Sequence, residues 1–164
     1  MIEKLRNMTS VYLYDDNKRM LMLYRIGSRA IKDSYIGTAG GHVENDELNN
    51  PRASVLRELE EETGLTIKDI KDLELKYITI RYKKNEARQN YYFFAKLKDS
   101  NLEINSNEGN LKWFTQEEIA GLDMPHTAKY MIKHYIEKGQ FDDNVYAGVA
   151  VPEGVQFIKL ESFE

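Results

Sequence analysis

Three glutamates, Glu58, Glu61 and Glu62, are the residues of this chain whose types and spacing point most directly to chemistry. On a helix that turns by roughly 100° per residue, their side chains fall within one arc about 100° wide. A hard divalent ion such as Mg²⁺ prefers carboxylate and carbonyl oxygens, and it keeps water and substrate phosphates in its other positions. The pattern therefore favours a magnesium site, and a merely solvated acidic helix face is the alternative interpretation.

The helix that must carry these glutamates is bracketed by its own sequence. Pro51 suits the first helical position, where a backbone N–H has no intrahelical partner, and Asn50 before it is a candidate N-cap. Gly64 can end the helix in the left-handed conformation that other side chains resist. Arg57 lies one turn before Glu61 and can pair with it. The apolar side chains of the helix form an adjoining stripe suited to a core: Val55, Leu56 and Leu59.

Residues 40–65 resemble the Nudix box, whose pattern is Gly, five residues, Glu, seven residues, then Arg-Glu-hydrophobic-x-Glu-Glu-x-Gly-hydrophobic. We expect a tight glycine turn before the helix. Nine residues, not seven, separate Glu47 from Arg57. Because Pro51 keeps a familiar distance from Arg57, we place the extra pair within residues 48–50, which leaves the role of Glu47 open. The positions of the pattern are filled by Gly41, Glu47, Arg57, Glu58, Leu59, Glu61, Glu62, Gly64 and Leu65.

The resemblance implies a fold and a reaction. Nudix proteins are typically α/β/α sandwiches around a mixed β-sheet, with the box as a loop–helix–loop, so we expect an α/β Nudix fold. We expect one domain, residues 1–164, with the box at about residues 41–65. The implied reaction is water attack on the pyrophosphate of a nucleoside diphosphate linked to another moiety, X. The implied cofactor is Mg²⁺, with Mn²⁺ as a substitute.

The same resemblance assigns roles to the residues of the box. Glu61 and Glu62 become the principal metal ligands, and Glu58 becomes a further ligand or the general base. Gly40 supplies a backbone carbonyl to the metal, and Arg57 orients the carboxylates without touching substrate.

A loop residue is added by analogy with MutT-type Nudix proteins. In those proteins a Glu shortly before a Trp-containing strand binds metal or serves as the base. Glu108 lies five residues before Trp113 and matches that position. A solvated loop carboxylate is the alternative interpretation of Glu108.

The substrate is less constrained than the metal site. The tail at residues 137–160 resembles that of MutT-type proteins, which favours a nucleoside triphosphate such as 8-oxo-dGTP, cleaved to monophosphate and pyrophosphate. Bacterial MutT reads guanine with an Asn near the start of the last helix, and residues 123–128 contain no Asn. The candidate substrate contacts are Arg25, Tyr35, Trp113 and Asp123, with core packing as the alternative for Trp113.

Two competing functions remain open. A hydrolase of ADP-ribose, a nucleotide sugar or a dinucleotide polyphosphate would keep the same metal site. A non-catalytic Nudix module that senses a nucleotide is a different class, and it would not need the full set of glutamates.

Composition limits the partners. The chain has 164 residues, a net charge of −4 and no cysteine, which indicates one ordinary globular domain without disulfides or thiolate metal sites. No basic footprint suggests a nucleic-acid polymer, and no apolar segment suggests a signal peptide or membrane span. We expect a cytoplasmic protein with a small-molecule nucleotide substrate, either monomeric or homodimeric.

The elements around the box follow from apolar patterning and turn residues. Helices are predicted after Pro51, after a Thr115 cap with Glu118 completing a capping box, and at residues 127–138. Residues 27–33 read as a polar loop, where Arg29 and Lys32 either face substrate phosphates or are solvated. Strands are predicted at residues 10–14, 19–25, 34–38, 73–83, 89–98, 111–115, 145–151 and 155–160.

Overall fold

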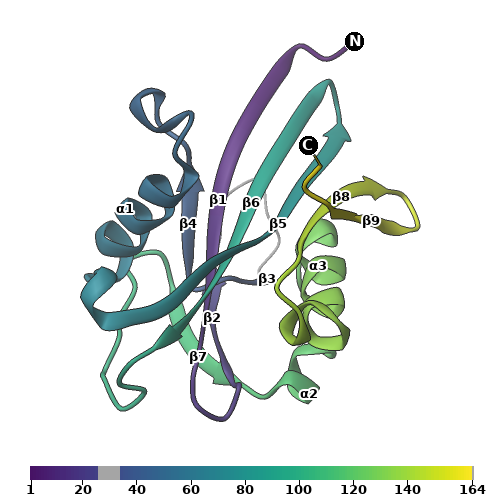
Figure 1. Ribbon diagram of the computed structural model, residues 1–164. Helices are drawn as coiled ribbons and strands as arrows, with labels where there is room; N and C mark the ends of the chain where they lie inside the picture. The colour runs from purple at the N-terminus through teal and green to yellow at the C-terminus, as the bar shows by residue number, and fades with distance from the viewer. Residues whose placement is uncertain (26–33, 164) are drawn as a thin grey trace.

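The computed structural model describes residues 1–25 and 34–163, and in that part the chain forms an α/β/α sandwich. A mixed sheet of nine described strands lies between helix α1 on one side and helices α2 and α3 on the other (Figure 1). This is the layered α/β architecture expected from the sequence. The loop expected at residues 27–33, with Arg29 and Lys32, lies outside the described residues.

The sheet has the order β3-β2-β1-β6-β5-β8-β9, with β4 paired to β1 and β7 paired to β2. β1 runs parallel to β6 and β5 runs parallel to β8, whereas the other pairs are antiparallel. The strands are β1 (Lys4–Tyr14), β2 (Met20–Arg25), β3 (Ser34–Ile36), β4 (Ala39–His42), β5 (Ile70–Lys83), β6 (Glu86–Leu97), β7 (Asn110–Phe114), β8 (Val145–Val151) and β9 (Gly154–Leu160). The helices are α1 (Pro51–Thr63), α2 (Gln116–Ile119) and α3 (His126–Glu137), and short 3-10 turns span Asn45–Glu47, Ile67–Asp69 and Gly139–Phe141.

The predicted strands are present, but some of them are longer than expected. β1 begins at Lys4 rather than at residue 10, and β6 begins at Glu86 rather than at residue 89. The β5–β6 connection is two residues, Lys84 and Asn85, with φ of 49° and 63°. Such a turn matches the twist of the flanking strands, so pairing continues to the hairpin tip and β6 starts earlier than predicted.

The caps predicted for the helices are present. Asn50 accepts a hydrogen bond from the Ala53 backbone N–H at 3.1 Å, and Gly64 ends α1 with φ of 77°. Thr115 and Glu118 form the expected capping box at the start of α2. The ends of α1 are therefore set by the residues that the sequence singled out.

Alternate residues of the strands fill two separate cores, one on each face of the sheet. Val11 and Leu13 of β1 face α1, where Val55 and Leu59 are buried, whereas Tyr12 faces α3. The buried residues of the α1-side core are Val11, Leu13, Leu21, Ala39, Val55, Leu59, Leu65, Ile70, Phe93, Ala95 and Leu97. Those of the α3-side core are Tyr12, Met20, Met22, Tyr77, Tyr92, Phe94, Phe114, Ile119, Met131, Ile132, Tyr135 and Tyr146.

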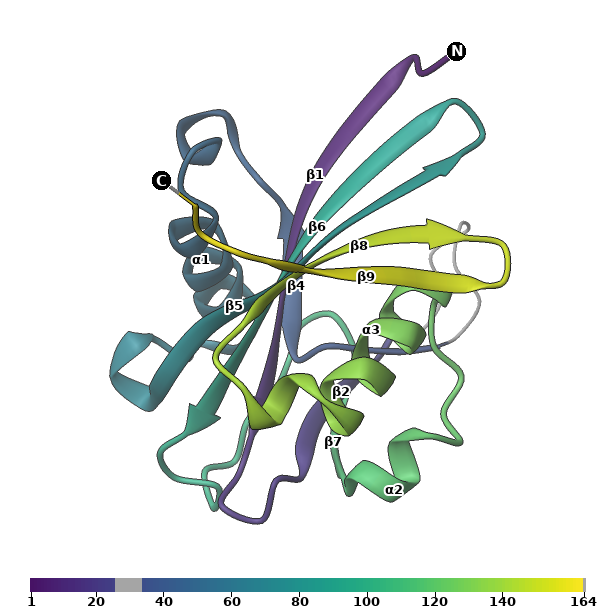
Figure 2. The ribbon, with the colours of Figure 1, turned by 45° about the vertical axis from the view of Figure 1, so that its right-hand side comes forward.

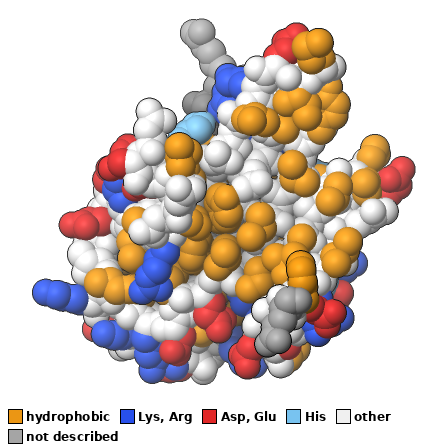
Figure 3. Space-filling model, turned by 45° about the horizontal axis from the view of Figure 1, so that its top comes forward, with side chains coloured by type: hydrophobic (Ala, Val, Ile, Leu, Met, Phe, Trp, Pro, Cys, Tyr) orange, Lys and Arg blue, Asp and Glu red, His pale blue; other side chains and the backbone are white. Residues whose placement is uncertain are grey.

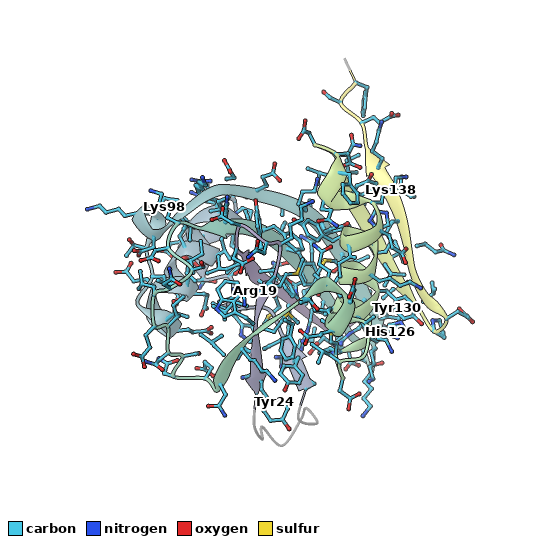
Figure 4. All side chains as sticks on the ribbon, turned by 90° about the horizontal axis from the view of Figure 1, so that it is seen from below. Arg19, Tyr24, Lys98, His126, Tyr130 and Lys138 are labelled. Atoms are coloured by element: carbon cyan, nitrogen blue, oxygen red, sulfur yellow. The ribbon has the colours of Figure 1, made fainter. Side chains whose placement is uncertain are left out.

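The terminal β8–β9 hairpin extends the sheet beside α3 (Figure 2). Figure 4 shows His126 and Tyr130 on the side of α3 next to this hairpin. Nε2 of His126 lies 2.9 Å from the Val151 carbonyl oxygen and 3.1 Å from that of Gly154. Because carbonyls only accept, Nε2 carries the hydrogen, and the imidazole joins the helix start to the hairpin turn.

One part of the α1-facing sheet surface has apolar side chains without a helix over them. The outer ends of β1, β5 and β6 extend beyond α1 in Figure 1, and Figure 3 shows hydrophobic side chains gathered on this side. The large apolar side chains exposed on these strands and on the terminal hairpin are Leu5, Ile80, Tyr82, Val149, Ile158 and Leu160.

Within the described chain, no helix combines the length and apolar character needed to cross a membrane.

Candidate active site

Seven of the predicted site residues line one cleft. Its volume is about 450 Å³, and its wall is formed by the second half of α1, by strands β1, β4, β5 and β6 of the sheet, and by the start of α3. The loop before β7 adds Glu108, and the end of β2 adds Arg25. The predicted residues that the structure brings together here are Arg25, Gly40, Arg57, Glu58, Glu61, Glu62 and Glu108.

The expected glycine turn is a strand. Gly40 and Gly41 lie within β4, where they pair with Ser10 and Thr9 of β1. Close packing explains why glycine occupies both positions, because a Cβ on Gly40 would overlap the Thr9 carbonyl and one on Gly41 would overlap the Glu58 carboxylate. The expectation of a turn was wrong, but the absent side chains let α1 approach the sheet.

Among the three glutamates of α1 that line the cleft, Glu62 has the most deeply buried carboxylate. The Gly40 backbone N–H donates to Oε2 of Glu62 at 3.2 Å. Burial raises the pKa of Glu62 to about 7, and although the Gly40 hydrogen bond opposes the shift, the negative charges of Glu58 and Glu108 reinforce it. This carboxylate therefore lies where additional positive charge would be stabilising.

Arg57 links the other carboxylates of the site. Its Nη1 lies 3.1 Å from Glu58 Oε1 and 3.0 Å from Glu61 Oε2. Its Nη2 donates to the His42 carbonyl at 3.0 Å, which ties α1 to the end of β4. Burial raises the pKa of Glu58 even though Arg57 lowers it. The arginine therefore orients two glutamates and a backbone segment at once.

The role that the sequence left open for Glu47 is to hold Arg57. The two side chains form a fork, with Nε to Oε2 at 2.8 Å and Nη2 to Oε1 at 2.9 Å. These hydrogen bonds from Arg57 lower the pKa of Glu47 to about 2. The 3-10 turn ends at Glu47 and α1 still begins at Pro51, so the extra residues lie before the helix and leave its glutamates in register.

The donor set fits a hard divalent ion. Gly40 offers a carbonyl oxygen and Glu58, Glu61 and Glu62 offer carboxylates, which are the ligand types that Mg²⁺ prefers. Among the described residues, none of these glutamates belongs to a group of three carboxylates with oxygens within 4.8 Å of one another. Glu44, Asp46 and Glu47 form such a group, but both Glu47 oxygens are bonded to Arg57.

The loop carrying Glu108 is tied to α1 by a residue that the sequence analysis missed. The Asn107 backbone N–H donates to the Glu62 carbonyl at 3.1 Å, and its side-chain Nδ2 donates to the Glu61 carbonyl at 3.0 Å. Oε2 of Glu108 then lies 4.0 Å from Nη2 of Arg25. No motif marks Asn107, because its importance depends on where the loop meets the last turn of the helix.

Three predicted substrate contacts are not among the residues that line the cleft. Trp113 packs against the α1-side core, and the Arg19 guanidinium lies 5.5 Å from its ring centroid. This agrees with core packing, the alternative role considered for Trp113 in the sequence. Tyr35 packs on Tyr24 and Phe114, and Asp123 is exposed, with its carbonyl accepting from the Tyr35 N–H at 2.8 Å. Trp113 thus belongs to the α1-side core and Tyr35 to the α3-side core, and neither ring lines the cleft.

Other cleft residues were not anticipated. Thr79, Arg81, Arg88 and Asn90 of β5 and β6 line the end of the cleft away from Glu108. Arg81 is opposite Arg88, and Thr79 is opposite Asn90, in the β5–β6 pair. The alternation of these strands was visible in the sequence, but their pairing register was not.

Comparison with protein families identifies the class. The family model described as NUDIX domain matches residues 4–135. The chain belongs to this family and is a Nudix pyrophosphohydrolase domain, acting on nucleoside diphosphates linked to another moiety. A search of curated proteins found no match.

Solved structures support the fold at low sequence identity. A MutT protein from Bacillus halodurans is 23% identical with a TM-score of 0.67, covering 93% of this chain and 97% of that one. An Ap4A hydrolase from C. elegans is 15% identical with a TM-score of 0.66, covering 80% and 96%. The NUDIX domain of Shewanella oneidensis NrtR, solved with ADP ribose, is 13% identical with a TM-score of 0.65, covering 83% and 89%. The fold is thus shared by proteins with different ligands.

Proposed function

We propose that this protein is a Mg²⁺-dependent hydrolase that cleaves the pyrophosphate of a nucleoside triphosphate, such as 8-oxo-dGTP, to the monophosphate and pyrophosphate. The observation that carries the proposal is the meeting of the Gly40 backbone with Glu58, Glu61 and Glu62 in one cleft. The proposal also treats residues 1–164 as one domain, since β8 of the terminal hairpin pairs with β5 of the central sheet.

The residues of the cleft would hold the metal ion, orient the carboxylates and accept a proton from the attacking water. When bound, Mg²⁺ would neutralise phosphate charge and lower the pKa of a coordinated water. Glu61, Glu62 and the Gly40 carbonyl would hold the ion, while Arg57 keeps the carboxylates oriented. A carboxylate oxygen of Glu58 or Glu108 would accept the proton that the attacking water loses.

A second class of substrate is favoured by the length of the cleft. Beyond the glutamates the cleft continues over β5 and β6 to Arg81 and Arg88, which leaves room for a large group on X. ADP-ribose, a nucleotide sugar or a dinucleotide polyphosphate would use this space. The neighbours described as an Ap4A hydrolase and as an ADP ribose complex agree with such ligands on this fold.

The test is a mass-resolved product analysis of the purified protein with Mg²⁺ and, in parallel, with a chelator. The panel contains 8-oxo-dGTP, normal dNTPs, ADP-ribose, nucleotide sugars and dinucleotide polyphosphates. Selective conversion of 8-oxo-dGTP to its monophosphate would support the proposal, and cleavage of only the larger substrates would replace it with the second class. Tight nucleotide binding without any cleavage would instead support a sensing module.

A further inference from the structure

Three arginines lie side by side across three neighbouring strands, and two of them, Arg81 and Arg88, line the outer end of the cleft. In the register of the sheet, Arg6 of β1 is opposite Arg88 of β6, and Arg88 is opposite Arg81 of β5. Residues opposite one another point to the same face, and adjacent strands are only about 4.8 Å apart. We call these three residues the arginine row. Like charges placed in this way destabilise a sheet, so the row needs compensation.

The compensation within the protein is incomplete. Glu86 is the carboxylate that all three arginines share, at 2.8 Å from Arg6, 3.3 Å from Arg88 and 3.7 Å from Arg81. Three positive charges therefore face one negative charge. His42, whose Nε2 lies 3.3 Å from Nη1 of Arg6, adds no negative charge, and Lys4 and Lys83 flank Glu86 in the next row. The row retains an excess of positive charge.

The row has unused hydrogen-bonding capacity. The Nε atoms of all three arginines are buried and have no hydrogen-bond partner among the described residues, although Nε of Arg6 forms an ion pair with Glu86 at 2.8 Å. A buried donor without an acceptor destabilises the protein. The side chains of Arg81 and Arg88, but not that of Arg6, also line the cleft, so a ligand within the cleft can contact these two guanidinium groups. A negatively charged ligand there would offset the excess positive charge of the row.

The arginine row is separated from the glutamates along β1. Gly40, which binds Glu62, is opposite Ser10, and Arg6 lies four residues earlier on the same strand. At roughly 3.3 Å per residue, this places the row about 13 Å along the sheet from the glutamates. Met8, Thr79 and Asn90 line the cleft between them. The terminal phosphate of a triphosphate cleaved at the glutamates does not extend this far.

We propose that the arginine row is a binding site for a second phosphate group of the substrate, remote from the pyrophosphate that is cleaved. Arginine suits this role because its planar guanidinium binds phosphate oxygens in pairs and keeps its charge. The inference rests on the proposed hydrolase activity and favours the second class of substrate, with a large group on X, over 8-oxo-dGTP. It specifies a nucleoside diphosphate linked to X in which either the nucleoside or X carries a further phosphate.

Recognition of a base is the competing use of the row. Arginine can bind the O6 and N7 edge of guanine, but a neutral base leaves the excess positive charge in place. The two uses predict different responses to a single added phosphate, so matched substrate pairs distinguish them. Two pairs differ only by one remote phosphate: CoA and dephospho-CoA, and ADP-ribose 2′-phosphate and ADP-ribose.

The experiment compares kcat/KM for each pair in the wild-type protein, Arg81→Gln and Arg88→Gln. Lys84→Gln, at the tip of the same hairpin, is the matched control, because Lys84 is exposed and lies outside the row. We expect wild-type and control to prefer the phosphorylated member of at least one pair by about tenfold or more. The two arginine variants should lose this preference, because the loss in kcat/KM should fall mainly on the phosphorylated member of the pair.

Binding gives a readout that does not depend on catalysis. We expect 2′,5′-ADP or 3′,5′-ADP to bind more tightly than AMP in calorimetry, and Arg88→Gln to remove the difference. Thermal unfolding checks the fold, and Arg81→Gln should not lower Tm because it relieves repulsion between Arg81 and Arg88. Equal cleavage and equal binding within every pair, or equal losses for both members in the variants, would overturn the proposal. If the phosphorylated nucleotides bind selectively but nothing is cleaved, the row stands and the hydrolase assignment fails.

Discussion

The two ends of the cleft differ in how their charges are compensated. At the glutamate end, Arg57 bonds to Glu47, Glu58 and Glu61, and it carries one positive charge among several carboxylates. At the arginine row the ratio is inverted, with three guanidinium groups around Glu86. One end therefore favours a cation and the other an anion. A substrate with phosphates at two separated positions, one set accompanied by Mg²⁺, would be complementary to both ends and bind in one direction.

The largest effect is expected from removing a charge at the glutamate end. Glu62→Gln should lower the Mg²⁺-dependent kcat/KM by about 10²-fold or more, because it removes a carboxylate in the group that would hold the metal. Steady-state kinetics on the best substrate measures this. Glu60→Gln is the matched control on the same helix, since Glu60 is exposed and outside the cleft. Full activity in the Glu62 variant would remove the basis for the metal assignment.

The next effect tests whether orientation matters as well as charge. Arg57→Lys keeps the charge but loses the guanidinium fork that joins Glu47 to Glu58 and Glu61. We expect kcat to fall by about 10- to 100-fold, as when a residue that orients metal ligands is replaced. Exposed Arg52→Lys, on the same helix, should behave as wild type. If both variants match wild type, Arg57 is not an orienting residue.

A smaller effect concerns stability and its dependence on pH. The pKa of Glu47 is about 2 in the folded protein, below its ordinary value of 4.5, because Arg57 stabilises the charged form. Its contribution is complete above the unfolded value and is lost as the pH falls toward 2. Glu47→Gln should therefore cost about 2 kcal/mol at pH 7, and the difference from wild type should shrink below pH 4.5.

Urea unfolding at pH 7, 5 and 3 measures this difference, and Asp46→Asn, at an exposed neighbouring position, is the control. A difference that stays constant between pH 7 and 3 would mean that Glu47 acts by packing rather than by its charge.

The smallest effect comes from the loop that borders the glutamate end. Asn107→Ala removes the hydrogen bond from Nδ2 to the Glu61 carbonyl but keeps the backbone bond to Glu62. We expect a loss of about 1 kcal/mol, seen as a roughly fivefold lower kcat/KM as Glu108 becomes less well positioned. Asn105→Ala, exposed in the same loop, is the control. Equal kinetics for the two variants would show that the tether does not position Glu108.

The glutamate end was accessible from sequence because its geometry is local. Pro51, Asn50 and Gly64 set the helix, and the helical repeat then places the glutamates. The β4 strand was missed because Gly40 and Gly41 are required by close packing against β1 and α1, which no local pattern encodes. The arginine row was missed for a related reason. Arg6, Arg81 and Arg88 become neighbours only through strand register, and register is set by tertiary contacts.

The parallel pairing of β1 with β6 also has a consequence for how the chain folds. Arg81 and Arg88 can meet early, because the two-residue turn at Lys84 and Asn85 makes β5–β6 a local hairpin. Arg6 joins them only when β1, which lies near the start of the sequence, pairs with β6 and so closes a long loop of the chain. Loop closure over such a distance is slow relative to hairpin formation. The positive end of the cleft should therefore be completed late in folding, after the hairpin that carries two of its three charges.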